Sequence, residues 1–305
     1  MHDVVIIGGG PAGFTAALYS SRGMLDTFLI ERLVPGGQMA TTYMMENYPG
    51  FEEPISGPDL ALRMEGQARK FGTKVIHDDV IELKLEGKVK TIRTTKTACE
   101  SKVVILCMGA SPRELGLPKE REFRGAGVSF CATCDGAFYK NKTVAVIGGG
   151  DTAAEDAIFL TRFCSKVFLI HRRNSLRAAK LLQEEVMNNP KIEIIWDTVV
   201  EEILGSFGVE GIKIRNLKTN DLSYLKLDGI FVAIGTVPNT ELVRGVVELD
   251  ENGYIITDEN MATNIPGVFA AGDIRHKTLR QVITAASDGA IAAYMAEKYI
   301  NENKW

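Results

Sequence analysis

The sequence has little of what marks several large protein classes. No apolar run approaches the ~20 residues of a membrane-spanning helix, and no basic segment with a cleavage site precedes the first strand, so neither membrane insertion nor a secretory signal is expected. Lys and Arg (35) are fewer than Asp and Glu (39), which argues against a broad nucleic-acid-binding surface. The five cysteines are an odd number and far too few for a disulfide scaffold, which fits a reducing, cytoplasmic compartment.

The composition is that of a folded protein rich in glycine. Apolar residues make up 45% and charged residues 24% of the chain, which excludes wholesale disorder. The 305 residues suit about two domains of ~150 residues each. Glycine contributes 30 residues, and the positions of these glycines define two related motifs.

A strand, a glycine-rich turn, a helix and a second strand follow one another twice. The first glycine and the residue closing the second strand are 23 positions apart in both copies, at Gly8 and Glu31 and at Gly148 and His171. Continuous apolar strands alternating with helices indicate a parallel sheet covered on both faces, so the repeat predicts an α/β protein with two nucleotide-binding units. The first copy comprises the strand at 4–7, the turn at 8–13, a helix to about Arg22 and the strand at 27–31. The second copy comprises the strand at 143–147, the turn at 148–153, a helix to about Phe163 and the strand at 166–170.

Other apolar runs predict the remaining elements. They are a hairpin at 81–85 and 89–94, a buried strand at 103–107, a strand at 192–196, an antiparallel strand at 212–215, a closing strand in the apolar run at 229–235 that ends in glycine, and a last strand at 267–271. A long amphipathic helix from about Leu279 to Asn301 is expected to follow. Pro112 and Pro238 each come just after a strand and are expected to mark crossings between domains.

Both turns follow the G-x-G-x-x-G/A pattern of dinucleotide-binding proteins. They read Gly8-Gly9-Gly10-Pro11-Ala12-Gly13 and Gly148-Gly149-Gly150-Asp151-Thr152-Ala153. The first Gly permits the tight turn, the second lets the backbone approach a pyrophosphate at the helix N-terminus, and the third residue allows close helix packing. Two ordinary turns are the alternative, but the strand before and the helix after each turn favour two dinucleotide sites.

The residues that close the second strands separate the two ligands. Glu31 can accept hydrogen bonds from ribose hydroxyls, so the first site is expected to take an unphosphorylated adenosine ribose. At the second site the cations predict a 2′-phosphate, hence NADPH rather than NADH, and a solvated basic patch is the alternative. These cations are His171, Arg172, Arg173 and Arg177.

Two dinucleotide sites in one chain favour two different dinucleotides. A nicotinamide and a flavin together form a hydride relay, whereas two nicotinamides would add little. Gly272-Asp273 follows a late parallel strand, where an acid can hydrogen-bond the ribityl chain of a flavin, although a helix cap is the alternative. The first site is therefore predicted to hold the flavin.

A pair of cysteines forms the chemical centre. Two residues separate Cys131 from Cys134, which permits a small-ring disulfide and commonly lowers a thiol pKa. A structural zinc site needs four ligands, and no second cysteine pair or paired histidines accompany the motif, so no metal is expected. Zinc and two ordinary thiols are the alternatives to a redox disulfide. Asp135 adjoins the pair and is a candidate general acid, or else a turn residue.

With these motifs the sequence resembles the low-molecular-weight bacterial and archaeal thioredoxin reductases over essentially its whole length. The motifs that carry the resemblance are the two turns at 8–13 and 148–153, Gly36-Gly37-Gln38, Asn47-Tyr48-Pro49-Gly50, Cys131-Ala132-Thr133-Cys134-Asp135, His171-Arg172-Arg173 with Arg177-Ala178, and Gly272-Asp273 with Arg280-Gln281. The resemblance implies a homodimeric FAD enzyme that reduces thioredoxin, or a thioredoxin-like protein, with NADPH.

The resemblance also assigns residues to the site. Cys134 would face the flavin, Cys131 would attack the thioredoxin disulfide and Asp135 would be the acid. The implied cofactor-binding residues are Gly8, Gly10, Pro11, Ala12, Gly13, Glu31, Arg32, Gly36, Gly37, Gln38, Asn47, Val80, Gly109, Gly272, Asp273, Arg280, Gln281, Val282, Gly148, Gly150, Asp151, Thr152, Ala153, His171, Arg172, Arg173, Arg177 and Gly235. Two segments depart from the family pattern: Cys107-Met108-Gly109 stands where Ala-Thr-Gly is frequent, and Gly235-Thr236 where Gly-His is frequent.

The implied fold consists of two Rossmann-like dinucleotide-binding domains of the three-layer ββα type, with the NADPH domain inserted into the FAD domain. Residues 1–111 and 240–305 would form the FAD domain, and 112–239 the NADPH domain with the cysteine pair. Because the nicotinamide and the dithiol belong to one domain and must both reach the flavin, a domain rotation is expected, with hinges near 111–112 and 236–239. A related flavin disulfide oxidoreductase with another substrate, or a ferredoxin-driven reductase, is the alternative.

Overall fold

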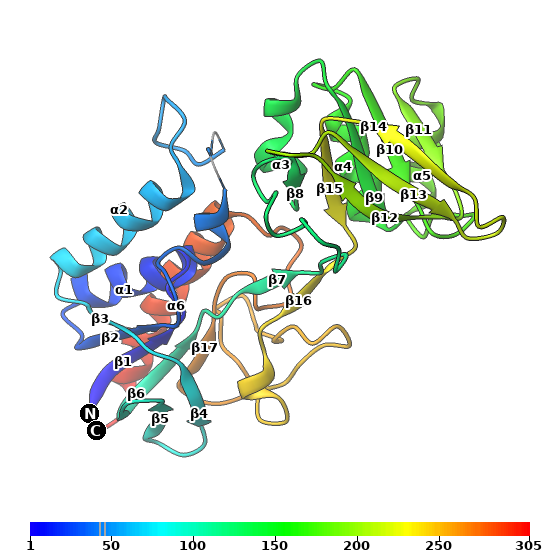
Figure 1. Cartoon of the computed structure of the whole chain (residues 1–305). Coiled ribbons are helices and arrows are strands. Elements are labelled where there is room, and N and C mark those ends of the chain that lie inside the picture. Colours follow the sequence, from blue (N-terminus) through cyan, green and yellow to red (C-terminus); the bar gives the residue numbers. More distant parts are fainter. Residues whose placement is uncertain (43, 46) are drawn as a thin grey trace. The chain divides into compact units, whose positions relative to one another are not determined.

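The computed structural model describes residues 1–42, 44–45 and 47–305, and Figure 1 shows their helices and strands. The described chain divides into two compact units. Unit 1 comprises Met1–Ser111 and Val237–Trp305, and unit 2 comprises Pro112–Thr236, so unit 2 is inserted into the sequence of unit 1. No helix within these described ranges has both the length and the apolar character that crossing a membrane requires.

Unit 1 is built on a seven-stranded sheet of order β3-β2-β1-β6-β5-β4, in which β17 also pairs with β6. Strands β1, β2, β3, β6 and β17 are parallel, whereas β4 and β5 form an antiparallel hairpin that joins β6. The elements are β1 (His2–Ile7), α1 (Pro11–Arg22), β2 (Thr27–Glu31), the 3₁₀ helix η1 (Gly37–Thr41), α2 (Gly57–Lys70), β3 (Lys74–His77), β4 (Val80–Lys84), β5 (Lys90–Thr94), β6 (Ala98–Leu106), the 3₁₀ helix η3 (Glu241–Val243), β17 (Val268–Ala270) and α6 (Val282–Glu302).

Alternate residues of β1 enter two different apolar clusters. Val4 and Ile6 pack with apolar residues of α1 and α6 on one face of the sheet. Val5 and Ile7 pack on the other face with residues of the β4–β5 hairpin, Leu83 among them. Successive side chains of a strand point to opposite faces, so a central strand that is apolar throughout must be covered on both. A helix layer, a parallel sheet and a hairpin layer result.

Unit 2 repeats this design. Its five-stranded sheet, of order β11-β10-β9-β15-β8, is parallel throughout, and a three-stranded antiparallel sheet of order β12-β13-β14 covers one face. Helix α4 packs on the other face. The elements are β8 (Val128–Ser129), α3 (Ala132–Asp135), the 3₁₀ helix η2 (Gly136–Tyr139), β9 (Thr143–Gly148), α4 (Asp151–Leu160), β10 (Lys166–Ile170), α5 (Lys180–Asn188), β11 (Ile192–Ile195), β12 (Thr198–Leu204), β13 (Gly211–Asn216), β14 (Leu222–Lys226) and β15 (Gly229–Ala233). The predicted α/β fold of the three-layer ββα type is confirmed.

The chain passes between the units at 111–112 and at 236–237, the latter three residues before the expected 239–240. At these passages the short strands β7 (Ala110–Pro112) and β16 (Thr236–Pro238) pair with each other. The Asn239 backbone N–H donates to the Gly109 carbonyl at 3.0 Å, and this bond holds the residues after β16 with unit 1.

The predicted strands at 27–31 and 166–170 are confirmed at their predicted bounds. Helix α4 ends at Leu160 rather than near Phe163, because the next three backbone N–H groups bond to the carbonyl three residues back, in tight turns. Helix α6 begins at Val282, three residues later than expected, because Gln281 caps its N-terminus. Helices α2 and α5 and strands β12 and β14 were not predicted from the sequence.

Candidate active site

The first glycine-rich turn joins β1 directly to α1. Gly8 has a φ of +106°, and a Cβ at this position would lie 2.4 Å from the Cys107 carbonyl oxygen. A Cβ at Gly13 would lie 1.8 Å from the Gly8 carbonyl oxygen, so α1 can approach the turn only with glycine there. Gly10 precedes the helix, and none of the described side chains caps it. The first N–H groups of α1 can therefore bind an anionic group such as a pyrophosphate.

Glu31 lies at the end of β2, beside this turn. Its carboxylate accepts the Gly9 N–H at 2.5 Å and the Leu33 N–H at 2.9 Å. The Gly36 N–H in turn donates to the Gly9 carbonyl at 2.7 Å, which brings Gly36 and its neighbour Gly37 to the turn. The structure thus assembles the predicted acid and the predicted glycine pair around one backbone segment.

Residues from the C-terminal part of unit 1 meet the same turn. A Cβ at Gly272 would lie 2.9 Å from the Ala12 Cβ, so the loop after β17 contacts the start of α1. Asn47 donates through Nδ2 to the Gln281 Oε1 at 3.1 Å. Four segments far apart in the sequence, each predicted to bind the first cofactor, therefore lie together.

Two buried polar atoms at this place have no hydrogen-bond partner within the described part of the chain. They are the Asp273 Oδ1 and the Arg280 Nε. Burial raises the pKa of Asp273, the charges of Lys277 and Arg280 lower it, and the like charge of Asp288 raises it. Buried polar groups are nearly always paired, so these two atoms are available to polar groups of a ligand in this part of unit 1. The residues present thus fit a dinucleotide with hydroxyl and phosphate groups.

The other residues predicted for this site lie around it in different environments. Arg32 and Gln38 are exposed, whereas Val80 is 7% exposed and packs in the apolar cluster between the sheet and the hairpin. Gly109 has a φ of +66°, and Val282 is the first residue of α6. The Val80 side chain is thus mainly a core residue.

The second glycine-rich turn has the same construction as the first. A Cβ at Gly148 would lie 2.4 Å from the Ala233 carbonyl oxygen and 2.6 Å from the Cβ of Ala153, the residue at the third position of the motif. Gly150 precedes α4 without a capping side chain from the described residues, and a Cβ on it would meet nothing within 4 Å. This helix N-terminus is also open to an anion.

The basic residues of unit 2 lie at this turn in two different environments. The Arg177 N–H donates to the Gly149 carbonyl at 2.7 Å, and Arg172, Arg173 and Arg177 are all exposed. His171 is 5% exposed and lies below the turn, where a Cβ at Gly149 would come within 2.2 Å of the imidazole. Burial lowers the pKa of His171, so the imidazole is neutral at pH 7. The three arginines provide the positive charge.

The remaining residues predicted for the second site lie at the start of α4 and after β15. Asp151 is exposed, and its Oδ1 accepts the Ala179 N–H at 2.7 Å, which ties α4 to the loop that carries Arg177. Thr152 is exposed next to it, and Gly235 is exposed with a φ of +102°.

Cys131 and Cys134 form a disulfide across the short helix α3, with 5.3 Å between their Cα atoms. The Cys131 Sγ lies 3.3 Å from the Thr133 Oγ1. The other three cysteines are free thiols, and burial raises the pKa of each, to about 11 for Cys164. No group of three possible metal ligands occurs among the described His, Cys, Asp and Glu residues. The thiol chemistry of the chain is thus concentrated at the predicted pair.

Asp135 follows Cys134 in the chain and accepts a hydrogen bond from Ser129, a residue that the sequence analysis did not identify. Burial raises the pKa of Asp135, and a hydrogen bond from the Ser129 hydroxyl at 2.6 Å lowers it in part. The Ser129 Oγ also accepts the Cys131 N–H at 3.1 Å. Ser129 is 3% exposed at the end of β8, and a lone Ser two residues before a Cys carries no distinguishing sequence signal.

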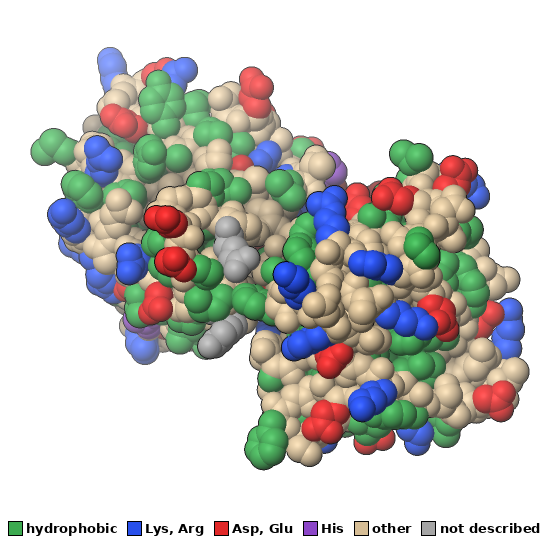
Figure 2. Space-filling model, turned by 90° about the horizontal axis from the view of Figure 1, so that it is seen from above, with side chains coloured by type: hydrophobic (Ala, Val, Ile, Leu, Met, Phe, Trp, Pro, Cys, Tyr) green, Lys and Arg blue, Asp and Glu red, His purple; other side chains and the backbone are tan. Residues whose placement is uncertain are grey.

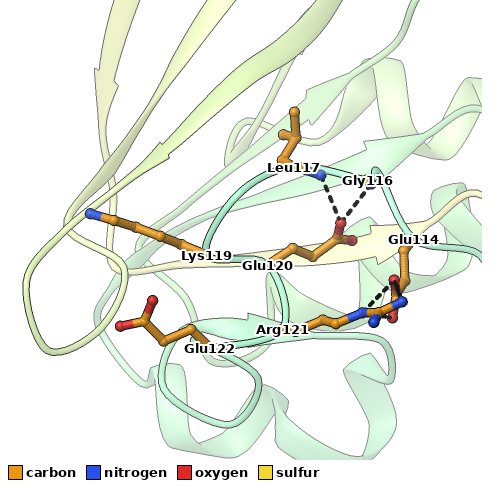
Figure 3. Close-up of a pocket in the computed structure, with 7 residues that line it drawn as sticks. All are labelled: Glu114, Gly116, Leu117, Lys119, Glu120, Arg121 and Glu122. Carbon is orange, nitrogen blue, oxygen red and sulfur yellow. Dashed lines mark hydrogen bonds and ion pairs between the residues drawn. The ribbon is translucent and has the colours of Figure 1, made fainter.

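A pocket of about 430 Å³ lies elsewhere in unit 2, in the loop at 114–122. Figure 3 shows the residues that line it. The Glu120 carboxylate accepts the backbone N–H groups of Leu115, Gly116 and Leu117, and Arg121 pairs with Glu114. These charges are thus compensated within the loop itself. On the face of the molecule shown in Figure 2, side chains of both charge signs are interspersed with apolar ones.

Known proteins share this combination of features. The family described as pyridine nucleotide-disulphide oxidoreductase matches residues 2–289. The thioredoxin reductase of Peptoclostridium acidaminophilum is 48% identical over 99% of this chain and 98% of its own, and that of Listeria innocua is 46% identical over 100% and 95%. The crystal structure of thioredoxin reductase from Streptococcus pyogenes superposes with a TM-score of 0.93 at 45% identity, covering 99% of both chains. The chain therefore belongs to the pyridine nucleotide-disulphide oxidoreductase family, among its thioredoxin reductases.

Proposed function

We propose that this chain is an NADPH-dependent, FAD-containing thioredoxin-disulfide reductase. Its reducing equivalents would pass to the Cys131–Cys134 pair and from there to the disulfide of thioredoxin or a thioredoxin-like protein. The observation that carries the proposal is the closed disulfide next to the half-buried acid Asp135, within the unit that contains the second dinucleotide turn. The full-length similarity to thioredoxin reductases supports it.

Unit 1 would hold the FAD. The open N-terminus of α1 would bind the pyrophosphate, Glu31 the adenosine ribose, and the unpartnered Asp273 Oδ1 a hydroxyl of the ribityl chain. FAD would supply a two-electron acceptor and donor between the nicotinamide and the disulfide.

Unit 2 would hold the NADPH at its own turn. Arg172, Arg173 and Arg177 are exposed at the end of β10 and in the loop tied to Gly149, where guanidinium groups can grip a 2′-phosphate in a bidentate manner. We propose that the neutral His171 packs against Gly149 and does not bind the phosphate.

The cysteine pair would carry out the exchange with the protein substrate. After two-electron reduction to the dithiol, the Cys131 thiolate attacks a sulfur of the substrate disulfide and forms a mixed disulfide. The Cys134 thiolate then attacks the Cys131 Sγ, which re-forms the internal disulfide and releases the substrate as a dithiol. Two protons are needed by the two leaving sulfurs, and we assign one of them to Asp135, which follows Cys134 in the chain and has a raised pKa.

We also propose that unit 2 turns relative to unit 1 during the cycle. The nicotinamide turn and the dithiol belong to the same unit, and both must reach a flavin held by the other. The two chain passages at 111–112 and 236–237 are the hinges that such a rotation would use. A disulfide engineered across these passages should stall turnover until it is reduced, and unchanged rates in the locked protein would contradict the rotation.

We also propose that the chain forms a homodimer and that it acts in the cytoplasm. Helices α1, α2 and α6 line a pocket of about 570 Å³, and its lining includes the apolar side chains of Tyr19 and Ile283, which are 51% and 43% exposed. Exposed apolar patches of this kind mark interfaces, and we propose a second copy of the chain as the occupant. Sedimentation should give a dimer for the native chain and a monomer for Ile283→Glu.

Turnover of oxidised thioredoxin with NADPH tests the proposed reaction. The native protein loaded with FAD should oxidise NADPH only when a disulfide substrate is present, and Cys131→Ser and Cys134→Ser should each abolish this activity while still binding FAD. Cys99→Ser is the matched control, because Cys99 lies in unit 1 outside the motif, and it should retain full activity. Turnover by either pair variant, or turnover with reduced ferredoxin but not with NADPH, would overturn the proposal.

A further inference from the structure

Helix α6 carries a carboxylate on its buried face. Asp288 is 7% exposed and lies between the buried residues Ala285, Gly289 and Ala292. Burying an ionised carboxylate is unfavourable unless it is paired and hydrogen-bonded. The partners of Asp288 therefore show what its charge stabilises.

All of the partners of Asp288 that the structure gives belong to one loop. The Oδ2 atom accepts the Gly272 N–H at 3.0 Å and the Lys277 Nζ at 2.8 Å. The Oδ1 atom accepts the Arg275 Nη1 at 3.2 Å. The Asp288 and Lys277 side chains are 9% and 8% exposed, so this ion pair is shielded from water. Asp288 on α6 thus holds the loop at 272–277 through three of its residues.

This loop is part of the proposed FAD site. Gly272 adopts a φ of +82° and touches Ala12 at the start of α1, and the next residue presents the unpartnered Asp273 Oδ1. A Cβ at Gly289 would lie 2.1 Å from the Ala12 carbonyl oxygen, so α6 also packs directly on the first turn. Gly289, which follows Asp288 on α6, and Gly272, whose N–H donates to Asp288, therefore both contact Ala12.

Lys277 is close to two carboxylates. It is hydrogen-bonded to Asp288, and its charge also acts on Asp273, where it lowers a pKa that burial raises. The charge of Asp288 acts on Asp273 in the opposite sense and raises that pKa. If Asp288 lost its charge, Asp273 would ionise more readily and the buried Lys277 ammonium would be left with it as the nearby carboxylate. A direct pair between these two would occupy the atom that is placed to bind a ligand.

We propose that Asp288 is a positioning residue for FAD: it holds the Gly272 N–H and pairs with Lys277, so that the Asp273 carboxylate stays available to the cofactor. The inference rests on the proposed FAD site in unit 1. It concerns charge balance around Asp273. Arg275, the other cation that Asp288 accepts, keeps its hydrogen bond to the Thr257 Oγ1 at 3.0 Å in every variant, so the effect depends on Lys277: removing both charges of the Asp288–Lys277 pair should be less harmful than removing that of Asp288 alone.

The test measures FAD affinity, by quenching of flavin fluorescence when apoprotein is titrated into FAD, together with the melting temperature of each apoprotein. Asp288→Asn keeps an acceptor for the Gly272 N–H but removes the charge, and it should weaken FAD binding at least tenfold. The double variant Asp288→Asn with Lys277→Gln should bind within threefold of the native chain. Lys298→Gln in place of Lys277→Gln is the matched control: Lys298 is exposed on the same helix, and its loss should not restore affinity.

Native-like affinity of Asp288→Asn, or equal weakness of the single and double variants, would overturn the inference. If the single variant fails to fold, the double variant decides: a folded double variant with native-like affinity supports the inference, whereas a weak or unfolded one contradicts it. Failure of the proposed function is distinguishable, because the native chain itself would then not bind FAD.

Discussion

Replacing Ser129 by Ala tests whether Asp135 acts as an acid. The Ser129 hydroxyl donates to the Asp135 Oδ2 at 2.6 Å in a site from which water is largely excluded, since Ser129 is 3% exposed. This bond stabilises the carboxylate form and opposes the effect of burial, which raises the pKa of Asp135. Without the hydroxyl, the pKa of Asp135 must rise further.

The size of the effect follows from the strength of the lost bond. A hydrogen bond to a charged group contributes about 1.5–3 kcal/mol. Because one pKa unit corresponds to about 1.4 kcal/mol, the pKa of Asp135 should rise by about one to two. A general acid acts in its protonated form, so the alkaline limb of the rate profile should move to higher pH by the same amount.

The assay is the pH dependence of kcat/KM for oxidised thioredoxin at saturating NADPH. Ser129→Ala should move the alkaline limb upward, and Asp135→Asn should lower the rate and abolish this limb. Ser165→Ala is the control: Ser165 is exposed in the same unit, its hydroxyl donates to the Lys142 carbonyl, and its loss should leave the profile unchanged. A limb that stays in place or moves downward in Ser129→Ala would refute the acid role.

Three further predictions concern the two turns and a buried charge. Gly13→Ala should lose bound FAD, measured as the flavin-to-protein ratio, because its Cβ would lie 1.8 Å from the Gly8 carbonyl oxygen, whereas Gly66→Ala in α2 meets nothing within 4 Å and should retain the flavin. Arg173→Gln should raise the KM for NADPH by about tenfold or more and leave that for NADH unchanged, and an equal change for both would contradict the assigned 2′-phosphate contact. Burial raises the pKa of Asp156 from 3.8 to about 7, so the native chain loses stability as pH rises through that range. Asp156→Asn should therefore increase the free energy of unfolding, measured in urea, by about 1–3 kcal/mol at pH 8 and by little at pH 4, and an equal gain at both would refute this.

The two βαβ units were predictable because their signals are local. A run of buried apolar residues that ends in glycine defines β1 and β9, and the 23-position spacing places Glu31 and His171 at equivalent points. Helix α2 was missed although its start is marked: Ser56 accepts the Asp59 N–H, and proline lies in the first turn. Among the described strands, β12 and β14 each pair with β13 alone, so their existence depends on the covering sheet as a whole.

At the site, sequence reasoning found the residues that belong to motifs and missed those that support them. His171 shares a motif with two arginines, but its side chain is buried beneath Gly149, and only the fold distinguishes these environments. Ser129 acts through its hydrogen bonds to Asp135 and Cys131, which no sequence pattern marks. Asp288 had a usable signal, because the 3.6-residue period places it on the apolar face of α6, where a carboxylate needs a partner.

The central claim is that electrons pass from NADPH to a flavin and then to a cysteine pair. An anaerobic absorbance titration of the protein reconstituted with FAD tests it most directly. NADPH should bleach the flavin band near 450 nm, and oxidised thioredoxin should restore it stoichiometrically in the native chain but not in Cys134→Ser. A protein that takes up no flavin, or a flavin band that returns equally in Cys134→Ser, would contradict the account.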